Sequence, residues 1–392
     1  MKIAIVYGND GSDVRVAKTC ATLVKQGHEV HFVGWDRRPM AEKNSVIPGV
    51  TSHVIRHPVA RLGSTGSGQW AFTQHAVKLI WQLGADVVCA VNEDNLARVG
   101  WLRGIAYRKL VCDVFDSHLD KCTERSWPIR AGVWAFVNSS RWWSDRLVAT
   151  DEHRFETFGP FKPKTIVVGN YPPDPGAEWA EIRPIGPPSL FVSGTLSRLR
   201  GIEQTLKAAE QVPGFRILAA GWAADEYAAD VFLKHPSVEF LGHVTPRQSL
   251  EYGAQCDALL AMYAPISRNQ ILASPNKIYD AISVGRPVII NSEAVVSQWV
   301  TKHEVGFACP YEDHNALAEF FATLAERRNH LEEFATRARQ LFLSGYSWEA
   351  MEERIAEMYA SLDPQSQGDP RTIQVPVASL DEESHNPTRK AA

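Results

Sequence analysis

The sequence predicts an α/β protein made of two doubly wound, Rossmann-like domains. Short, continuous apolar runs, which are typical of parallel strands buried on both faces, alternate along the chain with segments of helical period. The alternation stops at a proline-rich passage, 171–188, and then starts again. Because proline cannot continue a helix or a central strand, this passage is predicted to be a linker between a first domain, 1–170, and a second, 189–346.

The first domain opens with a strand, a helix and a second strand, which together make one βαβ unit. Gly27 closes the helix, as is common after a helix C-terminus. The predicted strands of this domain are 3–7, 29–34, 52–56, 86–91, 110–115, 147–150 and 165–168. The predicted helices are 14–25, 70–83 and 127–140.

The second domain repeats the alternation. Its predicted strands are 190–193, 215–219, 238–241, 258–262, 287–290 and 306–308. Its predicted helices are 201–211, 223–233, 246–255, 276–283 and 315–327. A last helix, 347–362, has Ser347 as its N-cap and is expected to return to the first domain. The polar segment 363–392 is expected to be disordered.

Composition excludes several classes of protein. Lys plus Arg is 41 against 45 for Asp plus Glu, a net charge of −4 that disfavours general nucleic-acid binding. Six cysteines without C-x-x-C spacing give neither a zinc ribbon nor a redox motif and fit a reducing compartment. The first apolar run is too short for a signal peptide, and no run is long enough to span a bilayer. We expect a cytoplasmic protein, with attachment to the inner face of the membrane left open.

Ligands of open parallel sheets bind beyond the carboxyl ends of the strands, which directs attention to the segments that follow them. The first such segment, 8–15, is a glycine-bearing turn into a helix whose amides can face an anion or a sugar. The fingerprint G-x-G-x-x-G is absent, although Asp36 is available as a ribose acid for an NAD-type site. The alternative is that the glycines only make a tight turn.

Three further strand ends carry chemistry. In 112–120, His118 can hydrogen-bond a substrate hydroxyl or act as an acid or base, unless it is a structural histidine at a helix start. In 193–201, Arg198 and Arg200 suit a diphosphate, unless both are simply solvated.

The fourth segment, 273–280, starts a capped helix with free amides. Lys277 lies in its first turn and Asp280 three residues later on the same face. A cation for phosphate and a carboxylate for ribose hydroxyls are what a nucleotide diphosphate needs. The alternative is a capping pair alone.

These segments, taken in order over about residues 1–362, resemble the retaining family 4 glycosyltransferases of the GT-B fold. The segments that carry the resemblance are 13–16, 27–30, 116–118, 193–195, 200–201, 240–242, 274–280, 285–288 and 346–349. The resemblance implies two domains facing across a cleft, and a nucleotide-diphosphate sugar as the donor substrate without a separate cofactor or metal. It also implies a cation clamp, retention of anomeric configuration and an acceptor proton taken by the leaving phosphate.

The resemblance assigns roles to particular residues. It implies catalytic roles for His118 near the donor sugar and for Arg200 and Lys277 at the diphosphate. The donor-binding residues that it implies are Gly11, Gly194, Thr195, Arg198, Ser274, Pro275, Asn276 and Asp280. On the acceptor side it implies Asp13, Arg15 and Asp116.

The chain departs from the family pattern at two positions. A pair of glutamates separated by seven residues is replaced by Leu272 and Asp280, within a Ser-Pro-Asn-Lys variant of the motif. Thr195 stands where many members carry an arginine, so Arg198 is the expected substitute. The acceptor is expected to be a glycan, a lipid-linked glycan or a small molecule, in polysaccharide biosynthesis. The alternatives are a nicotinamide-dependent oxidoreductase, a nucleotide-sugar epimerase and a non-catalytic nucleotide-sugar-binding partner subunit.

The segment 125–146 combines four arginines with five aromatic residues, a composition typical of interfacial helices. One hypothesis is that it docks on a membrane that carries a lipid-linked glycan. The favoured alternative is a core-facing stripe at helical spacing, formed by Ile129, Val133, Phe136, Ser140, Trp143 and Leu147. Trp70, Trp81 and Trp101 are expected to line the cleft or fill cores.

Overall fold

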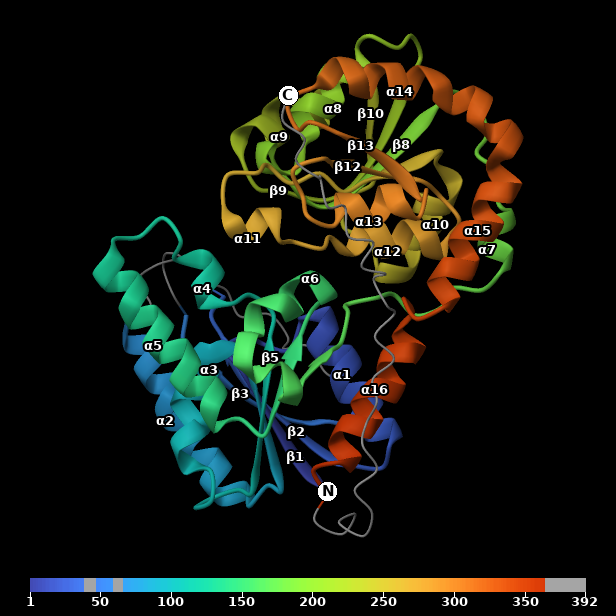
Figure 1. Cartoon of the computed structure of the whole chain (residues 1–392). Coiled ribbons are helices and arrows are strands. Elements are labelled where there is room, and N and C mark those ends of the chain that lie inside the picture. The colour runs from blue at the N-terminus through green and yellow to red at the C-terminus, as the bar shows by residue number, and fades with distance from the viewer. Residues whose placement is uncertain (39–46, 59–65, 364–392) are drawn as a thin grey trace, which may run out of the picture.

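The computed structural model describes residues 1–38, 47–58 and 66–363. It consists of two α/β domains, one above the other in Figure 1. The first sheet has the strand order β3-β2-β1-β4-β5-β6-β7 and the second β10-β9-β8-β11-β12-β13. Neighbouring strands in both sheets pair in parallel. The predicted fold class, two doubly wound Rossmann-like domains, is therefore confirmed.

The first domain follows the predicted alternation and has three helices more than expected, two of them only four residues long. Its strands are β1 Lys2–Tyr7, β2 Glu29–Asp36, β3 Thr51–Arg56, β4 Val87–Val91, β5 Lys109–Val114, β6 Arg146–Ala149 and β7 Thr165–Val167. Its helices are α1 Val14–Lys25, α2 Gly66–Leu83, α3 Asn92–Val99, α4 His118–Lys121, α5 Trp127–Trp143 and α6 Glu152–Phe155. Helix α3 was not predicted, because it begins directly after β4 without a separating turn.

The second domain and the linker before it contain four helices that the sequence did not predict, Glu178–Glu181 in the linker and Arg268–Ile271, Ser297–Lys302 and Leu331–Leu343 in the domain. Its strands are β8 Ser189–Leu196, β9 Arg216–Ala223, β10 Val238–Phe240, β11 Ala258–Leu260, β12 Val288–Asn291 and β13 Gly306–Cys309. The helices are α7 Glu178–Glu181, α8 Ile202–Ala209, α9 Glu226–Asp230, α10 Pro246–Gln255, α11 Arg268–Ile271, α12 Asn276–Ser283, α13 Ser297–Lys302, α14 His314–Arg327 and α15 Leu331–Leu343.

The strands at the centre of the first sheet are apolar on both faces because both faces are covered. Ile3 and Ile5 of β1 point into the core on one side, together with side chains of α1. Ala4 and Val6 point into the core on the other side, with side chains of α2 and α3. The residues of this continuous apolar run thus alternate between the cores on the two faces of the sheet.

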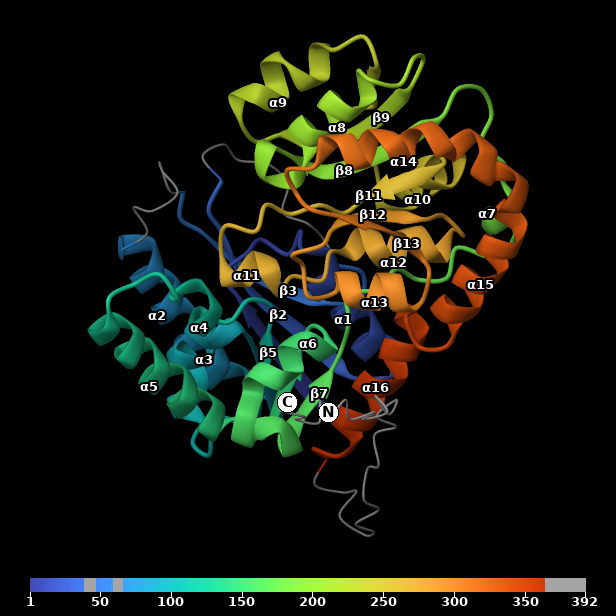
Figure 2. The ribbon, with the colours of Figure 1, turned by 45° about the horizontal axis from the view of Figure 1, so that its top comes forward.

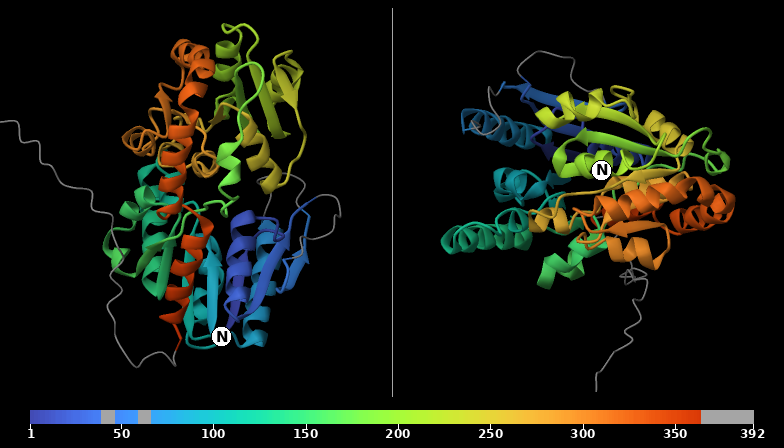
Figure 3. Two further views of the ribbon diagram at one scale, coloured as in Figure 1. Left: turned by 90° about the vertical axis from the view of Figure 1, so that its right-hand side faces the viewer. Right: turned by 90° about the horizontal axis from the view of Figure 1, so that it is seen from above.

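The chain returns to the first domain at its C-terminal end. Helix α16, Trp348–Ala360, follows α15 and packs on α1. Figure 3 shows α15 and α16 running one after the other down one side of both domains. The Trp348 indole donates to the Thr22 hydroxyl at 3.1 Å, and Glu352 accepts a 2.6 Å hydrogen bond from Lys25. The Trp348 backbone also donates to the carbonyl of Pro172 in the linker. The chain crosses between the domains twice, at the linker and at the start of α16, and this hydrogen bond joins the two crossings.

The predicted core stripe of the 125–146 segment is in part wrong. Ser140 and Leu147 are buried, but Ile129, Phe136 and Trp143 are 51%, 38% and 49% exposed. The buried side chains of α5 are Val137, Ser140 and Arg141. A polar contact sets this orientation, since the guanidinium of Arg141 enters the domain and pairs with the carboxylate of Glu93 at 3.3 Å.

Trp70, Trp81 and Trp101, which we expected in the cleft or in cores, are 65%, 60% and 51% exposed. None of the described helices is long and apolar enough to cross a bilayer.

Candidate functional site

A cavity of about 580 Å³ lies where the carboxyl ends of the two sheets face each other. Figure 2 shows α11 of the second domain above α4 of the first at this junction. The lining side chains of the first domain follow β1, β5, β6 and β7 and are Ser12, Asp13, Val14, Arg15, Phe115, Asp116, Thr150, Asp151, Arg154 and Asn170. Those of the second domain are Arg200, Tyr263, Asn269, Gln270, Ala273, Ser274, Pro275, Asn276 and Tyr279.

The turn after β1 is held by local hydrogen bonds. The side chain of Asn9 accepts from the amides of Gly11 and Ser12, and Gly11 has a φ of 92°, which favours glycine. Asp13 then caps α1 by accepting from the amides of Arg15 and Val16. Asp13 lines the cavity, whereas Gly11 lies in the turn that leads to it and is not among the lining residues.

Arg15 lines the cavity from a buried position. Its guanidinium donates to the carbonyl of Val168 at 2.6 Å and to Asp113 at 2.9 Å, and it lies over the ring of Phe115. Burial raises the pKa of Asp113, an effect that the charge of Arg15 opposes. Arg15 therefore fixes the carboxyl ends of β5 and β7 beside the cavity.

Asp36, the residue available for an NAD-type ribose contact, lies elsewhere. It is 1% exposed and accepts a hydrogen bond from Arg38 at 2.9 Å, which lowers its pKa. It does not line the interdomain cavity.

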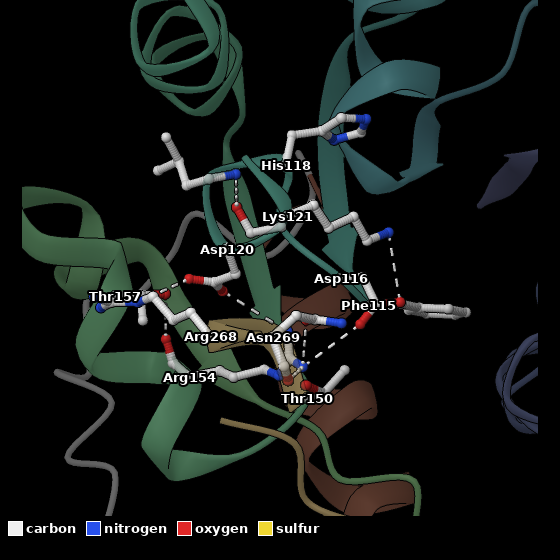
Figure 4. Close-up of polar contacts among 12 residues, drawn as sticks. Phe115, Asp116, His118, Asp120, Lys121, Thr150, Arg154, Thr157, Arg268 and Asn269 are labelled. Atoms are coloured by element: carbon white, nitrogen blue, oxygen red, sulfur yellow. Dashed lines mark hydrogen bonds and ion pairs between the residues drawn. The ribbon is translucent and has the colours of Figure 1, made fainter. Parts of the chain in front are cut away.

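A polar cluster joins the two domains on one side of the cavity (Figure 4). Arg154 donates to the side chain of Asn269 at 2.9 Å and lies 3.5 Å from Asp116. Arg268 of α11 lies 3.5 Å from Asp120 of α4. Residues of the first domain thus bind residues of the second next to the cavity.

Asp151, at the end of β6, was not predicted as a site residue. Its carboxylate accepts from the amide of Arg154 at 2.7 Å, and burial raises its pKa. The sequence did carry a signal for it, because Asp151 directly follows the predicted strand 147–150, as Asp116 follows 110–115.

His118 lies beside the cavity but is not among its lining residues. In Figure 4 its ring points away from the contacts between Asp116 and Arg154. Its Nδ1 is 3.1 Å from the buried carboxylate of Glu93, and this hydrogen bond raises the pKa of His118. Glu93 is held in turn by Arg141 and by the hydroxyl of Ser117.

The pair formed by His118 and Glu93 predicts a pH-dependent stability. Because the folded-state pKa of His118 is raised above its ordinary value of 6.5, the stabilisation is complete below pH 6.5 and is lost as pH rises through the raised pKa. The ring is 36% exposed, so we expect about 1 kcal/mol or less. Urea unfolding of the protein and of His118→Gln over a pH series checks this. A difference that grows with increasing pH would contradict it.

Of the two arginines that follow β8, Arg200 lines the cavity and Arg198 does not. The guanidinium of Arg200 stacks on the ring of Tyr263, 3.7 Å from its centroid. Arg198 is 60% exposed and points elsewhere, since it pairs with Glu203 at 3.3 Å and lies over Tyr227. Arg198, the expected substitute for the arginine that Thr195 replaces, therefore does not line the cavity in this structure.

Two glycines shape the same strand end. Gly194 has a φ of 100°, and a β-carbon built there would meet open space. A β-carbon on Gly221 in the neighbouring strand would lie 1.9 Å from the carbonyl oxygen of Gly194. The close approach of β8 and β9 thus requires glycine at 221, and the backbone at Gly194 stays accessible. Thr195 follows on β8 without lining the cavity.

Helix α12 points its N-terminus at the cavity, which Ser274, Pro275 and Asn276 line. The expectation of a capped start is wrong, because no side chain caps this helix. The Ser274 hydroxyl is instead 2.8 Å from the hydroxyl of Tyr279. First-turn amides without a side-chain partner are the feature of a helix that binds anions.

Lys277 and Asp280 form an ion pair at 2.8 Å just behind this N-terminus, and neither lines the cavity. The ammonium of Lys277 also donates to the hydroxyl of Ser249 at 3.3 Å, which is 3.4 Å from that of Ser193. This chain of contacts leads from Lys277 to the residue before Gly194. Among the described residues, no group of three or more His, Cys, Asp or Glu is placed to hold a metal ion.

Comparisons with known proteins agree with this arrangement. Residues 187–327 match the family model described as "Glycosyl transferases group 1". No curated protein matches the chain in sequence. Among solved structures, sucrose-phosphate synthase from Thermosynechococcus elongatus superimposes with a TM-score of 0.73 at 14% identity, covering 92% of this chain and 99% of that one.

Two further structures are similar. HepE from Anabaena, in complex with UDP and glucose, has a TM-score of 0.67 at 16% identity and covers 92% of this chain and 100% of that one. The catalytic domain of starch synthase IV from Arabidopsis thaliana, bound to ADP and acarbose, has a TM-score of 0.64 at 12% identity, with 92% and 99% covered. The chain therefore has the GT-B fold, and most of its second domain matches the group 1 glycosyl transferase model.

Proposed function

We propose that the protein is a retaining glycosyltransferase that moves a sugar from a nucleotide-diphosphate sugar to an acceptor hydroxyl, without a metal ion or a separate cofactor. The observation that carries the proposal is the cavity between the domains, where Arg200 and the uncapped N-terminus of α12 meet polar side chains of the first domain. Two of the similar proteins, HepE and starch synthase IV, are described in complexes with UDP, UDP-glucose or ADP, which supports a donor of this class.

The donor diphosphate would lie between Arg200, the α12 amides and the open backbone at Gly194. Positive charge at these groups stabilises the leaving phosphate while the anomeric carbon gains oxocarbenium character. The ammonium of Lys277 donates to the hydroxyl of Ser249, which contacts Ser193 beside Gly194. Lys277 would supply a second cation there. Asp280, its present partner, would hold the ribose, as the resemblance implies. In this arrangement fixed cations supply the charge that a divalent ion would otherwise bring.

The acceptor would bind on the side of the first domain, where Asp13, Asp116 and Arg15 line the cavity. With retention of configuration, the leaving phosphate takes the proton of the acceptor hydroxyl, so no protein base is required on the opposite face. His118, oriented by Glu93, would act at the edge of the donor sugar. We propose a glycan, lipid-linked or small-molecule acceptor and a role in polysaccharide biosynthesis.

A thermal-shift screen tests donor binding. In EDTA, we expect the melting temperature to rise with one of the UDP-, GDP-, ADP- or dTDP-sugars, by the equivalent of about 2.7 kcal/mol at a hundredfold excess over Kd. Lys277→Ala should lose this shift. Lys207→Ala should keep it, because Lys207 pairs with Glu203 on the exposed side of α8. A shift with NAD alone, or one that needs a divalent ion, would contradict the proposal.

Turnover separates the remaining alternatives. A non-catalytic binding subunit would show the melting shift but release no nucleoside diphosphate in the presence of any acceptor. A nucleotide-sugar epimerase would change the sugar without an acceptor.

A further inference from the structure

Helix α5 presents an outward face without a charged side chain. The helix contains two cations, Arg130 and Arg141, and no acidic residue. Its large exposed side chains, between 38% and 79% exposed, are Trp127, Ile129, Trp134, Phe136, Trp142 and Trp143. A solvent-facing helix of a globular protein carries charged and polar residues on that face. The face of α5 is therefore unusual for a surface in contact with water alone.

Four of the aromatic residues of the helix border a strip of small side chains, and the fifth, Trp142, lies on the strip near its C-terminal end. At 100° per residue, Ala131, Gly132, Ala135 and Ser139 lie opposite the buried residues Val137 and Arg141, and all four are exposed. Trp127 and Trp134 lie along one edge of this strip, and Phe136 and Trp143 along the other. We call the strip and its aromatic edges the α5 face. It is about 25 Å long, from the rise of a 17-residue helix.

The C-terminal half of α5 anchors the helix to the first domain and leaves the α5 face pointing outward. Arg141 is anchored to Glu93 and Ser117, and Val137 is buried beside it. Within 127–136, by contrast, no residue is buried. Figures 1 and 3 place α5 at the outer side of the first domain, away from the second. The helix is therefore fixed in orientation while most of its surface has no partner in the chain.

The charges around the α5 face are mainly positive, although the whole chain carries −4. Lys121, Arg125 and Arg130 are exposed at the end of the helix next to α4, together with the acid Glu124, and Lys121 lies 3.5 Å from Asp116. Lys164, at the other end, donates to the carbonyl of Trp142 at 3.1 Å. Exposed tryptophans over an uncharged strip, flanked by cations, are the composition of helices that lie in a membrane interface.

We infer that the α5 face docks the first domain on a bilayer that contains anionic lipid, with the helix axis in the plane of the membrane. The cationic end of α5 adjoins α4, and the same segment contributes Asp116 to the cavity. Docking in this way brings the acceptor side of the cavity toward the lipid headgroups. The surface does not depend on which reaction the cavity performs, and its test needs no substrate.

Flotation with vesicles tests the inference. We expect the full chain to float with vesicles of phosphatidylcholine and phosphatidylglycerol and much less with phosphatidylcholine alone. Ala135→Glu, which puts a carboxylate on the strip, should weaken partitioning at least about tenfold. The matched control is Ala322→Glu, the same change at an exposed position of α14 in the other domain, and it should bind as the unchanged protein does.

Both substitutions lie on exposed helix positions, so melting temperatures should stay unchanged and separate lost binding from lost folding. The inference is overturned if the full chain floats with neither vesicle, or if Ala135→Glu floats as well as Ala322→Glu. It is also overturned if sedimentation shows a dimer that Ala135→Glu dissociates, since a second copy then covers the α5 face. Failure of the donor screen would leave this result untouched.

Discussion

Arg200→Ala is expected to lower kcat/KM for the nucleotide sugar by about 10²–10³-fold, the loss typical of removing one group that stabilises developing negative charge. The guanidinium lines the cavity and is stacked on Tyr263, so its position is fixed before the donor binds. Arg200→Lys should recover only part of the activity, since an ammonium cannot bind two phosphate oxygens as a planar fork does. Steady-state rates of nucleoside diphosphate release measure the effect.

The matched control for Arg200 lies two residues away. Arg198 has the same charge and the same short 3₁₀ segment, but it is exposed and paired with Glu203. Arg198→Ala should therefore leave kcat/KM within about threefold, which is about 0.6 kcal/mol. Equal losses in the two variants would mean that general positive charge, and not a group at a fixed position, binds the donor.

Glu93→Leu is expected to reduce the free energy of unfolding by about 3–5 kcal/mol, because it leaves the Arg141 guanidinium buried without its carboxylate. Glu93 is fully buried, and Arg141 is 1% exposed. Adding Arg141→Met should restore most of the loss, since replacing both members of a buried pair is often close to neutral. Urea unfolding of the single and double variants provides the measurement.

A surface ion pair serves as the control for this second prediction. Asp230 and Lys234 form a pair at 2.7 Å with both side chains about two-thirds exposed, at 66% and 67%. Asp230→Ala should cost less than about 1 kcal/mol. If Glu93→Leu costs no more than Asp230→Ala, then Glu93 does not hold α5, and the orientation of the α5 face needs another explanation.

The sequence predicted the two domains because apolar runs and helical periods depend on short-range spacing. It also predicted most of the segments that line the cavity, because the carboxyl ends of parallel strands share one edge of a sheet. The same rule applied to 147–150 would have found Thr150 and Asp151. This strand end also carries a histidine, His153, three residues after the predicted strand, as His118 is after 110–115.

Other features depend on contacts between distant segments, and spacing along the chain does not encode these. Arg154 meets Asn269 only because the two domains dock, and the Ser274 hydroxyl is bonded to Tyr279 where a helix cap was expected. The orientation of α5 is a further case. Its periodicity predicted a buried apolar stripe, but Arg141 pairs with Glu93 of α3, a helix that the sequence analysis did not predict.

In the proposed function, a nucleotide-diphosphate sugar binds between the domains at Arg200 and α12. The most direct measurement is a crystal structure of the protein grown in EDTA with the nucleotide sugar that raises its melting temperature. The account predicts the diphosphate within hydrogen-bond distance of the α12 amides and the Arg200 guanidinium, with the sugar toward Asp116. A nucleotide bound at the turn after β1, with Arg200 and α12 free of phosphate, would contradict the account.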